Sequence, residues 1–103
     1  MPEFVKIGSK ADLPGSDEAK EFPCGESKII CVANVGGELS ALDNVCLHRG
    51  GPLGQGVIAD GTLICPWHGW QYNPKTGEAI HSPGAKVAAY PIKVEGDDVL
   101  VEV

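Results

Sequence analysis

Hydrophobic and polar residues alternate along both ends of the chain with the two-residue period of a β-strand. In the last such segment Val99, Val101 and Val103 fall on one face, and Glu102 falls on the other. The apolar run at 29–33 is rich in β-branched residues and is typical of a buried strand. The whole pattern predicts short strands at residues 4–7, 18–23, 28–35, 38–42, 87–94 and 99–103.

Glycine and proline mark the turns between these strands. The chain has 14 glycines and 8 prolines, which favours short elements joined by many turns. Gly36-Gly37 is a two-residue hairpin signal, and residues 95–98 supply a second hairpin. Residues 11–17 have room for one helical turn, because Pro14-Gly15 stops a longer helix. The expected fold class is all-β, as an antiparallel sandwich or small barrel.

The middle of the chain departs from this pattern. Residues 44–69 are rich in glycine and predict a long loop, interrupted by one short hairpin around Asp60-Gly61. Long loops inside a compact domain are usually functional. We therefore expect the chemistry of the protein to lie in this segment.

Composition and charge exclude several classes of function. The 103 residues predict a single domain over 1–103, and 14 acidic against 8 basic residues give a net charge of -6. Such an acidic chain is a poor nucleic-acid binder. No apolar run approaches the roughly 20 residues that span a bilayer. The N-terminus also lacks the layout of a signal peptide, so we expect a cytoplasmic protein without a membrane partner.

Two short motifs carry candidate metal ligands. Cys46 and His48 form the first motif, and Cys65 and His68 form the second, with sixteen residues between the motifs. Two thiolates and two imidazoles suit either tetrahedral zinc or an iron–sulfur cluster. A zinc finger usually supplies its cysteines together and its histidines together. One cysteine and one histidine from each loop instead favours a dinuclear site.

Segments 46–51 (CLHRGG) and 65–70 (CPWHGW) resemble the two cluster-binding loops of Rieske proteins. The resemblance implies a Rieske-like antiparallel β base into which cluster-binding loops, at about 44–70, are inserted. It also implies one [2Fe–2S] cluster per chain. By the same resemblance, Cys46 and Cys65 would bind the inner iron, and His48 and His68 the outer one.

Other residues near the motifs have less specific interpretations. We expect His81 to be a loop histidine, because the four ligands are already complete. Trp67 and Trp70 have two possible roles, shielding a cluster or packing on the sheets. Cys24 and Cys31 are expected to be buried reduced thiols, with a disulfide as the alternative.

Four positions bear on the reduction potential. The high-potential branch of the Rieske family has a disulfide whose cysteines match Gly51 and Trp67 here, and a sulfide-bonded serine that matches Trp70. Tyr72 does match that branch's tyrosine, which donates to a cysteine sulfur. With fewer donors, we expect a potential towards the negative end of the Rieske range, roughly -150 to +300 mV.

The resemblance implies a one-electron carrier and not an enzyme in its own right. The leading hypothesis is a ferredoxin that passes electrons from a flavin-dependent reductase to a terminal, ring-hydroxylating type of oxygenase. The alternative is the small Rieske subunit of an assimilatory nitrite reductase. A zinc-stabilised interaction module is a third hypothesis from a different class.

Overall fold

The alternating sequence folds almost entirely into short β-strands, so the predicted all-β class is confirmed. The computed structural model describes residues 4–24, 28–45, 51–67, 69–80, 82 and 84–102. No helix within these ranges is long and apolar enough to cross a membrane. The described elements are β1 (Phe4–Ser9), η1 (Lys10–Asp12), β2 (Glu18–Cys24), β3 (Lys28–Val35), β4 (Glu38–Asp43), η2 (Leu53–Gln55), β5 (Val57–Ala59), β6 (Thr62–Ile64), β7 (Gln71–Tyr72), β8 (Ala89–Tyr90), β9 (Ile92–Glu95) and β10 (Asp98–Glu102).

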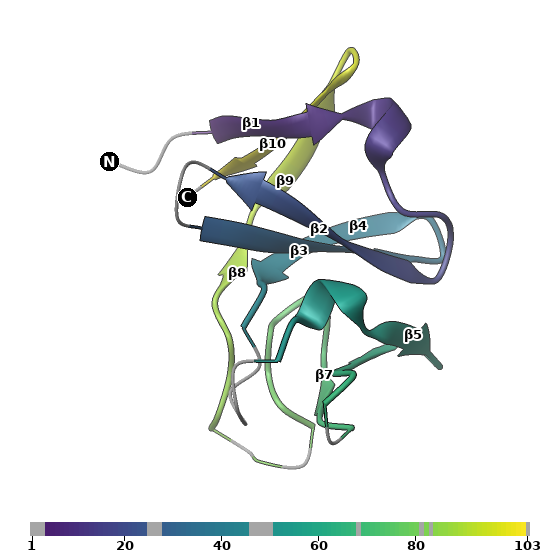
Figure 1. Ribbon diagram of the computed structural model, residues 1–103, viewed down its shortest axis with the longest axis vertical. Coiled ribbons are helices and arrows are strands. Elements are labelled where there is room, and N and C mark those ends of the chain that lie inside the picture. Colours follow the sequence, from purple (N-terminus) through teal and green to yellow (C-terminus); the bar gives the residue numbers. More distant parts are fainter. Residues whose placement is uncertain are drawn as a thin grey trace.

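These strands form two antiparallel sheets. A three-stranded sheet has the order β1-β10-β9, and a seven-stranded sheet has the order β7-β6-β5-β2-β3-β4-β8. Figure 1 shows the small sheet at one end of the molecule, β2, β3 and β4 across its middle, and η2, β5 and β7 at the other end. We call the end with the small sheet the base, and the opposite end the loop end.

Residues 30–33 of the central strand β3 are buried on both faces, which explains most of its apolar run, although Ile29 at the start of the run is exposed. Ile30 and Val32 face the base, whereas Cys31 faces the loop end. Two hydrophobic cores result. The base core consists of Ile7, Phe22, Cys24, Ile30, Val32, Ala41, Val99 and Val101. The loop core consists of Cys31, Leu42, Leu53, Leu63, Cys65, Tyr72, Ala79 and Val87.

Most of the predicted turns are confirmed. Gly36 and Gly37 have φ of 59° and 94°, as a tight hairpin between β3 and β4 requires. Asp60 and Gly61 have φ of 51° and 75° and join β5 to β6, which form the short hairpin expected in the middle of the chain. The single helical turn expected at 11–17 is the 3-10 helix η1, which begins slightly earlier.

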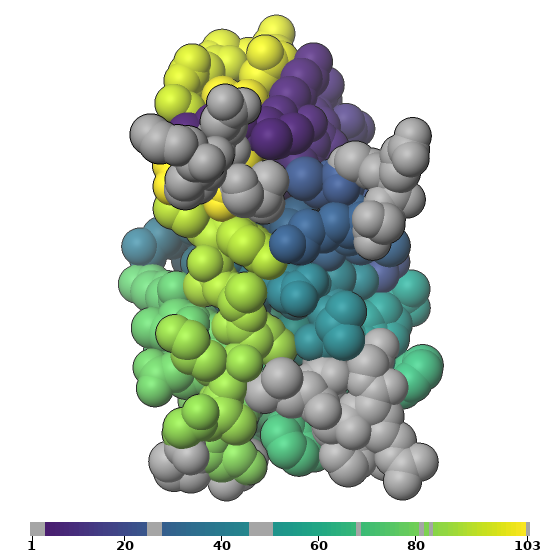
Figure 2. Space-filling model, turned by 90° about the vertical axis from the view of Figure 1, so that its left-hand side faces the viewer, coloured from purple at the N-terminus to yellow at the C-terminus, as the bar shows by residue number. Residues whose placement is uncertain are grey.

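The predicted strand at 87–94 is wrong in one respect. The chain forms two strands there, which separate at Pro91 and belong to different sheets. Proline has no N–H to donate to a ladder, so a continuous paired strand through this position is unfavourable. β8 pairs with β4, and β9 pairs with β10. In Figure 2, the segment between β7 and β9 runs along one side of the molecule from the loop end to the base.

Cys24 and Cys31 are both buried free thiols, as expected, and the alternative of a disulfide between them is wrong. In the hairpin of β2 and β3, Cys24 pairs with Lys28, and Cys31 pairs with Glu21. Cys24 lies in the base core and Cys31 in the loop core, so the two sulfurs are on opposite faces of the sheet.

Burial of the Cys31 thiol makes the stability of the folded protein depend on pH. Burial first, and the charge of Glu21 second, raise the pKa of this thiol from its usual 9.0 to about 12. Between these values the unfolded chain has released the thiol proton and the folded chain retains it, so stability falls as pH rises. We expect Cys31→Ala to lessen the fall by about 1.4 kcal/mol per pH unit in this window. Urea unfolding at a series of pH values measures the two slopes, and equal slopes would contradict the assignment.

Candidate metal centre

The second predicted ligand loop is closed by a backbone hydrogen bond at its neck. Cys65 directly follows β6, and its N–H donates to the Trp70 carbonyl at 2.7 Å. Gly69 has φ of 70°, a conformation that favours glycine, and this allows the chain to turn back towards β7. Cys65 is 1% exposed and contributes to the loop core. His68, the other predicted ligand of this loop, lies outside the described residues.

The first predicted ligand loop is also closed at its neck. Val45 and Pro52 form an antiparallel bridge, and the Leu53 N–H donates to the Asn44 carbonyl at 3.1 Å. The predicted ligands Cys46 and His48 lie between these positions in the sequence and outside the described residues. The structure therefore describes the neck of the first loop and one predicted ligand of the second.

Gly51 brings the two loops into contact. A Cβ atom added to Gly51 would lie 3.0 Å from Cys65 Sγ and 3.0 Å from Trp67 Cγ. These distances are shorter than ordinary van der Waals contacts, so only glycine allows this approach without a shift of its neighbours. The end of the first loop thus lies directly on Cys65, a predicted ligand of the second loop, and this approach is compatible with one site that uses both motifs.

Residues 3–91 match the family model of the Rieske [2Fe-2S] domain. The chain belongs to the Rieske family.

Two relatives show the same relationship, and one solved structure shows the same fold. The chain is 33% identical over 100 residues to the ferredoxin component of an alkene monooxygenase system from Xanthobacter autotrophicus. The aligned region covers 96% of this chain and 80% of that relative. The chain is also 33% identical over 94 residues to the ferredoxin subunit of 3-phenylpropionate/cinnamic acid dioxygenase from Escherichia coli. This alignment covers 89% of this chain and 86% of that relative. The structure of a ferredoxin from Sphingomonas yanoikuyae B1 superimposes with a TM-score of 0.84, at 24% identity over 98% of this chain and 99% of that one.

The family match and the two relatives confirm the predicted class of protein. The chain is a Rieske ferredoxin, similar to the ferredoxin components of oxygenase systems. The family implies a [2Fe–2S] cluster, which argues against the zinc module. The relatives also favour the oxygenase hypothesis over the nitrite reductase subunit.

The described residues fit a Rieske cluster. Cys65 supplies a buried sulfur, the type of ligand that iron–sulfur clusters use. Gly51 leaves space at this sulfur that a side chain would fill. Gly51 and Trp67, which match the disulfide of the high-potential branch, are adjacent here, because a Cβ on Gly51 would lie 3.1 Å from Trp67 Cβ.

The aromatic residues near Cys65 have different environments. Tyr72 is fully buried in the loop core that also contains Cys65, and its ring centroid lies 6.4 Å from that of Trp70. Trp70 packs against the same core, as the packing alternative for this residue requires. Trp67 is 48% exposed and lies at the protein surface beside Gly51. His81, the expected bystander, lies outside the described residues.

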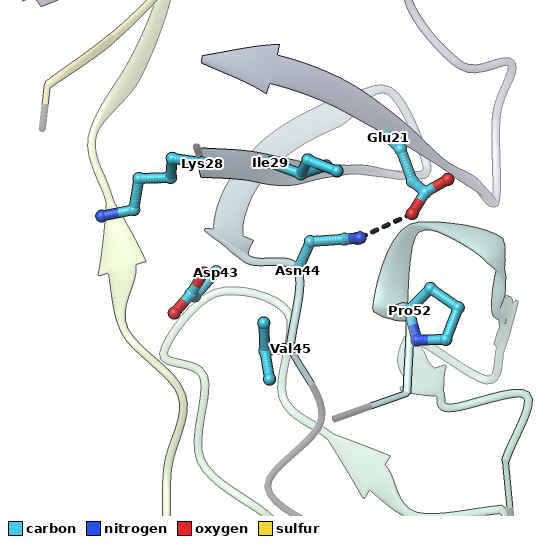
Figure 3. Close-up of a pocket in the computed structure, with 7 residues that line it drawn as sticks. All are labelled: Glu21, Lys28, Ile29, Asp43, Asn44, Val45 and Pro52. Carbon is cyan, nitrogen blue, oxygen red and sulfur yellow. Dashed lines mark hydrogen bonds between the residues drawn. The ribbon is translucent and has the colours of Figure 1, made fainter. Parts of the chain in front are cut away.

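Sequence reasoning missed a group of polar residues at the neck of the first loop, namely Glu21, Lys28, Asp43 and Asn44. They line a pocket of about 630 Å³, which also contains exposed Ile29 and Val45. Figure 3 shows the Asn44 side chain pointing from the start of the loop to Glu21 on β2, with Pro52 at the end of the loop nearby. The only signal in the sequence was a polar residue, Asn44, two positions before a predicted ligand.

Proposed function

We propose that this chain carries one electron at a time from a flavin-dependent reductase to a terminal oxygenase in the cytoplasm. One [2Fe–2S] cluster per chain would be held by Cys46, His48, Cys65 and His68, within a single Rieske domain whose cluster-binding loops span about 44–70. The bound cluster would supply the one-electron redox chemistry. The contact of Gly51 with Cys65 Sγ is the observation that carries this proposal, since it joins the two motifs.

The residues of the chain would have three tasks at this site. Cys65, buried in the loop core, would hold the iron away from water. Tyr72, buried in the same core, would donate its hydroxyl to a cysteine sulfur, as the family resemblance implies. His48 and His68 would be the imidazole ligands at the outer iron, through which the electron passes to a partner.

The surface near the loops suits contact with a protein partner. Val45 is 52% exposed and Trp67 is 48% exposed, so apolar side chains flank both loops. From residue 44 to 59 the only charged residue is Arg49, and from 61 to 74 there is none. An apolar contact surface on an acidic protein suits transient association with a partner. The charged surface outside the contact then orients the two proteins as they approach.

Spectroscopy and reconstitution test the proposal together. The purified protein should be red-brown and should give a rhombic EPR signal when reduced, whereas a zinc protein would be colourless and EPR-silent. Reduced protein should then pass electrons to an oxygenase in single-turnover mixing. Electron delivery to a siroheme nitrite reductase, and none to an oxygenase, would favour the small-subunit alternative.

The midpoint potential is expected towards the negative end of the Rieske range, roughly -150 to +300 mV. Gly51 and Trp67 replace the disulfide of the high-potential branch, and Trp70 replaces its serine donor. Fewer donors leave more negative charge on the reduced cluster and make reduction less favourable. Protein-film voltammetry measures this value, and a midpoint above about +150 mV would contradict the expectation.

Electron transfer to the partner is expected to slow as salt is added. The net charge of -6 would attract a basic docking surface, and salt screens that attraction. Between about 0.01 M and 1 M ionic strength, the Debye length falls from about 30 Å to about 3 Å. Stopped-flow mixing with the partner measures the rate, and reduction by an uncharged mediator is the control. A partner rate that is independent of salt would rule out acidic steering.

A further inference from the structure

We propose that Asn44 and Glu21 are positioning residues that set the geometry of the first ligand loop, and so of Cys46 and His48. The inference rests on the proposed function, because it assigns these two residues a role towards the cluster. The carboxamide of Asn44 and the carboxylate of Glu21 form a connected group with the far end of the loop. We call this group the loop clamp; it comprises Glu21, Asn44, Gly54 and Gln55.

Asn44 uses all of its polar groups to hold the loop. Its backbone N–H donates to the Ile29 carbonyl at 3.3 Å, and its carbonyl accepts from the Leu53 N–H at 3.1 Å. Its side-chain Oδ1 accepts from the Gly54 N–H at 2.6 Å, and its Nδ2 donates to Glu21 Oε2 at 2.6 Å. Asn44 is only 6% exposed, so these bonds have little competition from water.

The position of these bonds links them to the predicted ligands. Asn44 lies two residues before Cys46, whereas Leu53 and Gly54 follow the loop. The clamp therefore joins the two ends of one loop, just below the bridge between Val45 and Pro52. Asn44 is bonded to Ile29 on β3 and to Glu21 on β2, and Gln55 is bonded to the same Glu21, so the two ends of the loop are held together.

Glu21 determines which way the Asn44 amide points. A carboxylate only accepts hydrogen bonds, so it selects the Nδ2 side of the amide and leaves Oδ1 facing Gly54. The other carboxylate oxygen, Oε1, accepts from Gln55 Nε2 at 3.1 Å. Hydrogen bonds to an ionised group are stronger than neutral ones. Glu21 thus holds both the beginning and the end of the loop.

Gly54 allows the clamp to close. A Cβ on Gly54 would meet Glu21 Cγ, and it would lie 2.8 Å from Asn44 Oδ1 and 2.9 Å from the Glu21 backbone nitrogen. The backbone of η2 can therefore lie directly on β2 only because this residue has no side chain.

The test exchanges the amide and the carboxylate. Asn44→Asp alone places a second carboxylate against Glu21, where an N–H···O bond was present. Asn44→Asp combined with Glu21→Gln restores all three side-chain hydrogen bonds, since the new amide on β2 can donate to the new carboxylate on the loop and still accept from Gln55. The double variant also keeps the net charge of the wild type. Ile29→Asp is the control for charge, because it adds an acid at the same pocket outside the clamp.

Two measurements on the cluster-loaded protein give the expected results. The rate of bleaching under a chelator should rise about tenfold in Asn44→Asp, and should stay within about twofold of wild type in the double variant and in Ile29→Asp. The g-values of the reduced EPR signal should shift in Asn44→Asp and return in the double variant. If Asn44→Asp does not fold, Glu21→Ala carries the same expectations, with Glu21→Gln as its charge-matched control.

The outcomes separate this inference from the proposed function. Asn44→Asp with an unchanged EPR signal and a lower melting temperature would overturn positioning and leave the clamp a stabilising feature only. A double variant as impaired as Asn44→Asp would overturn it as well. A wild-type protein without the rhombic signal would overturn the proposed function, and the inference with it.

Discussion

Replacing Cys65 with alanine is expected to abolish the colour and the reduced EPR signal of the purified protein. Cys65 is the one proposed ligand within the described ranges, and its sulfur lies against Gly51 of the first loop. Without this thiolate, one iron of the cluster would lose half of its protein ligands. Visible absorption and EPR of protein purified without oxygen measure the loss.

Cys31→Ala is the matched control for this experiment. Cys31 is also a buried cysteine of the loop core, so its replacement removes a similar volume from the same surroundings. This variant should keep the EPR signal and lose about 1 kcal/mol of stability through the small cavity. A rhombic signal that survived in Cys65→Ala would falsify the proposed ligand set.

Gly77→Ala is expected to destabilise the protein by about 4 kcal/mol, or to prevent folding, because two separate penalties coincide. Gly77 has φ of 81°, which L side chains rarely adopt, and an added Cβ would meet the Val87 carbonyl oxygen. The same carbonyl cannot retreat easily, since the Val87 N–H donates to the Gly77 carbonyl at 2.9 Å. Urea unfolding of the purified variant measures the loss.

Two other glycines separate the two penalties. Gly61 has φ of 75° and open space around it, so Gly61→Ala should lose only about 1 kcal/mol. At Gly56 an added Cβ would meet the Ile64 carbonyl, without a positive φ. Gly56→Ala should therefore measure the steric penalty alone. Equal losses in Gly61→Ala and Gly77→Ala would show that the contact with Val87 is unimportant.

The sequence was sufficient for the local features of this fold. The hairpins at Gly36-Gly37 and Asp60-Gly61 were predictable, because tight turns depend on residues that tolerate positive φ. The ligand motifs are likewise local patterns of the sequence, and their role in holding a cluster stays a prediction. Pro91 also indicates the break between β8 and β9, whereas the apolar pattern at 87–94 predicts one continuous strand.

Contacts between distant segments could not be predicted in this way. Glu21 and Asn44 are 23 residues apart in the sequence, and nothing in either neighbourhood indicates that their side chains meet. The contact of Gly51 with Cys65 likewise depends on how two loops approach each other. Such contacts depend on how separate segments pack against each other, which no periodicity encodes.

The double burial of β3 has a consequence for how the molecule unfolds. Neighbouring residues of this strand, Ile30, Cys31 and Val32, alternate between the base core and the loop core. Neither core can lose β3 without exposing the apolar surface of the other. The two ends of the molecule should therefore melt as one cooperative unit, and the cluster-binding end is not a detachable module that could be transplanted without its base.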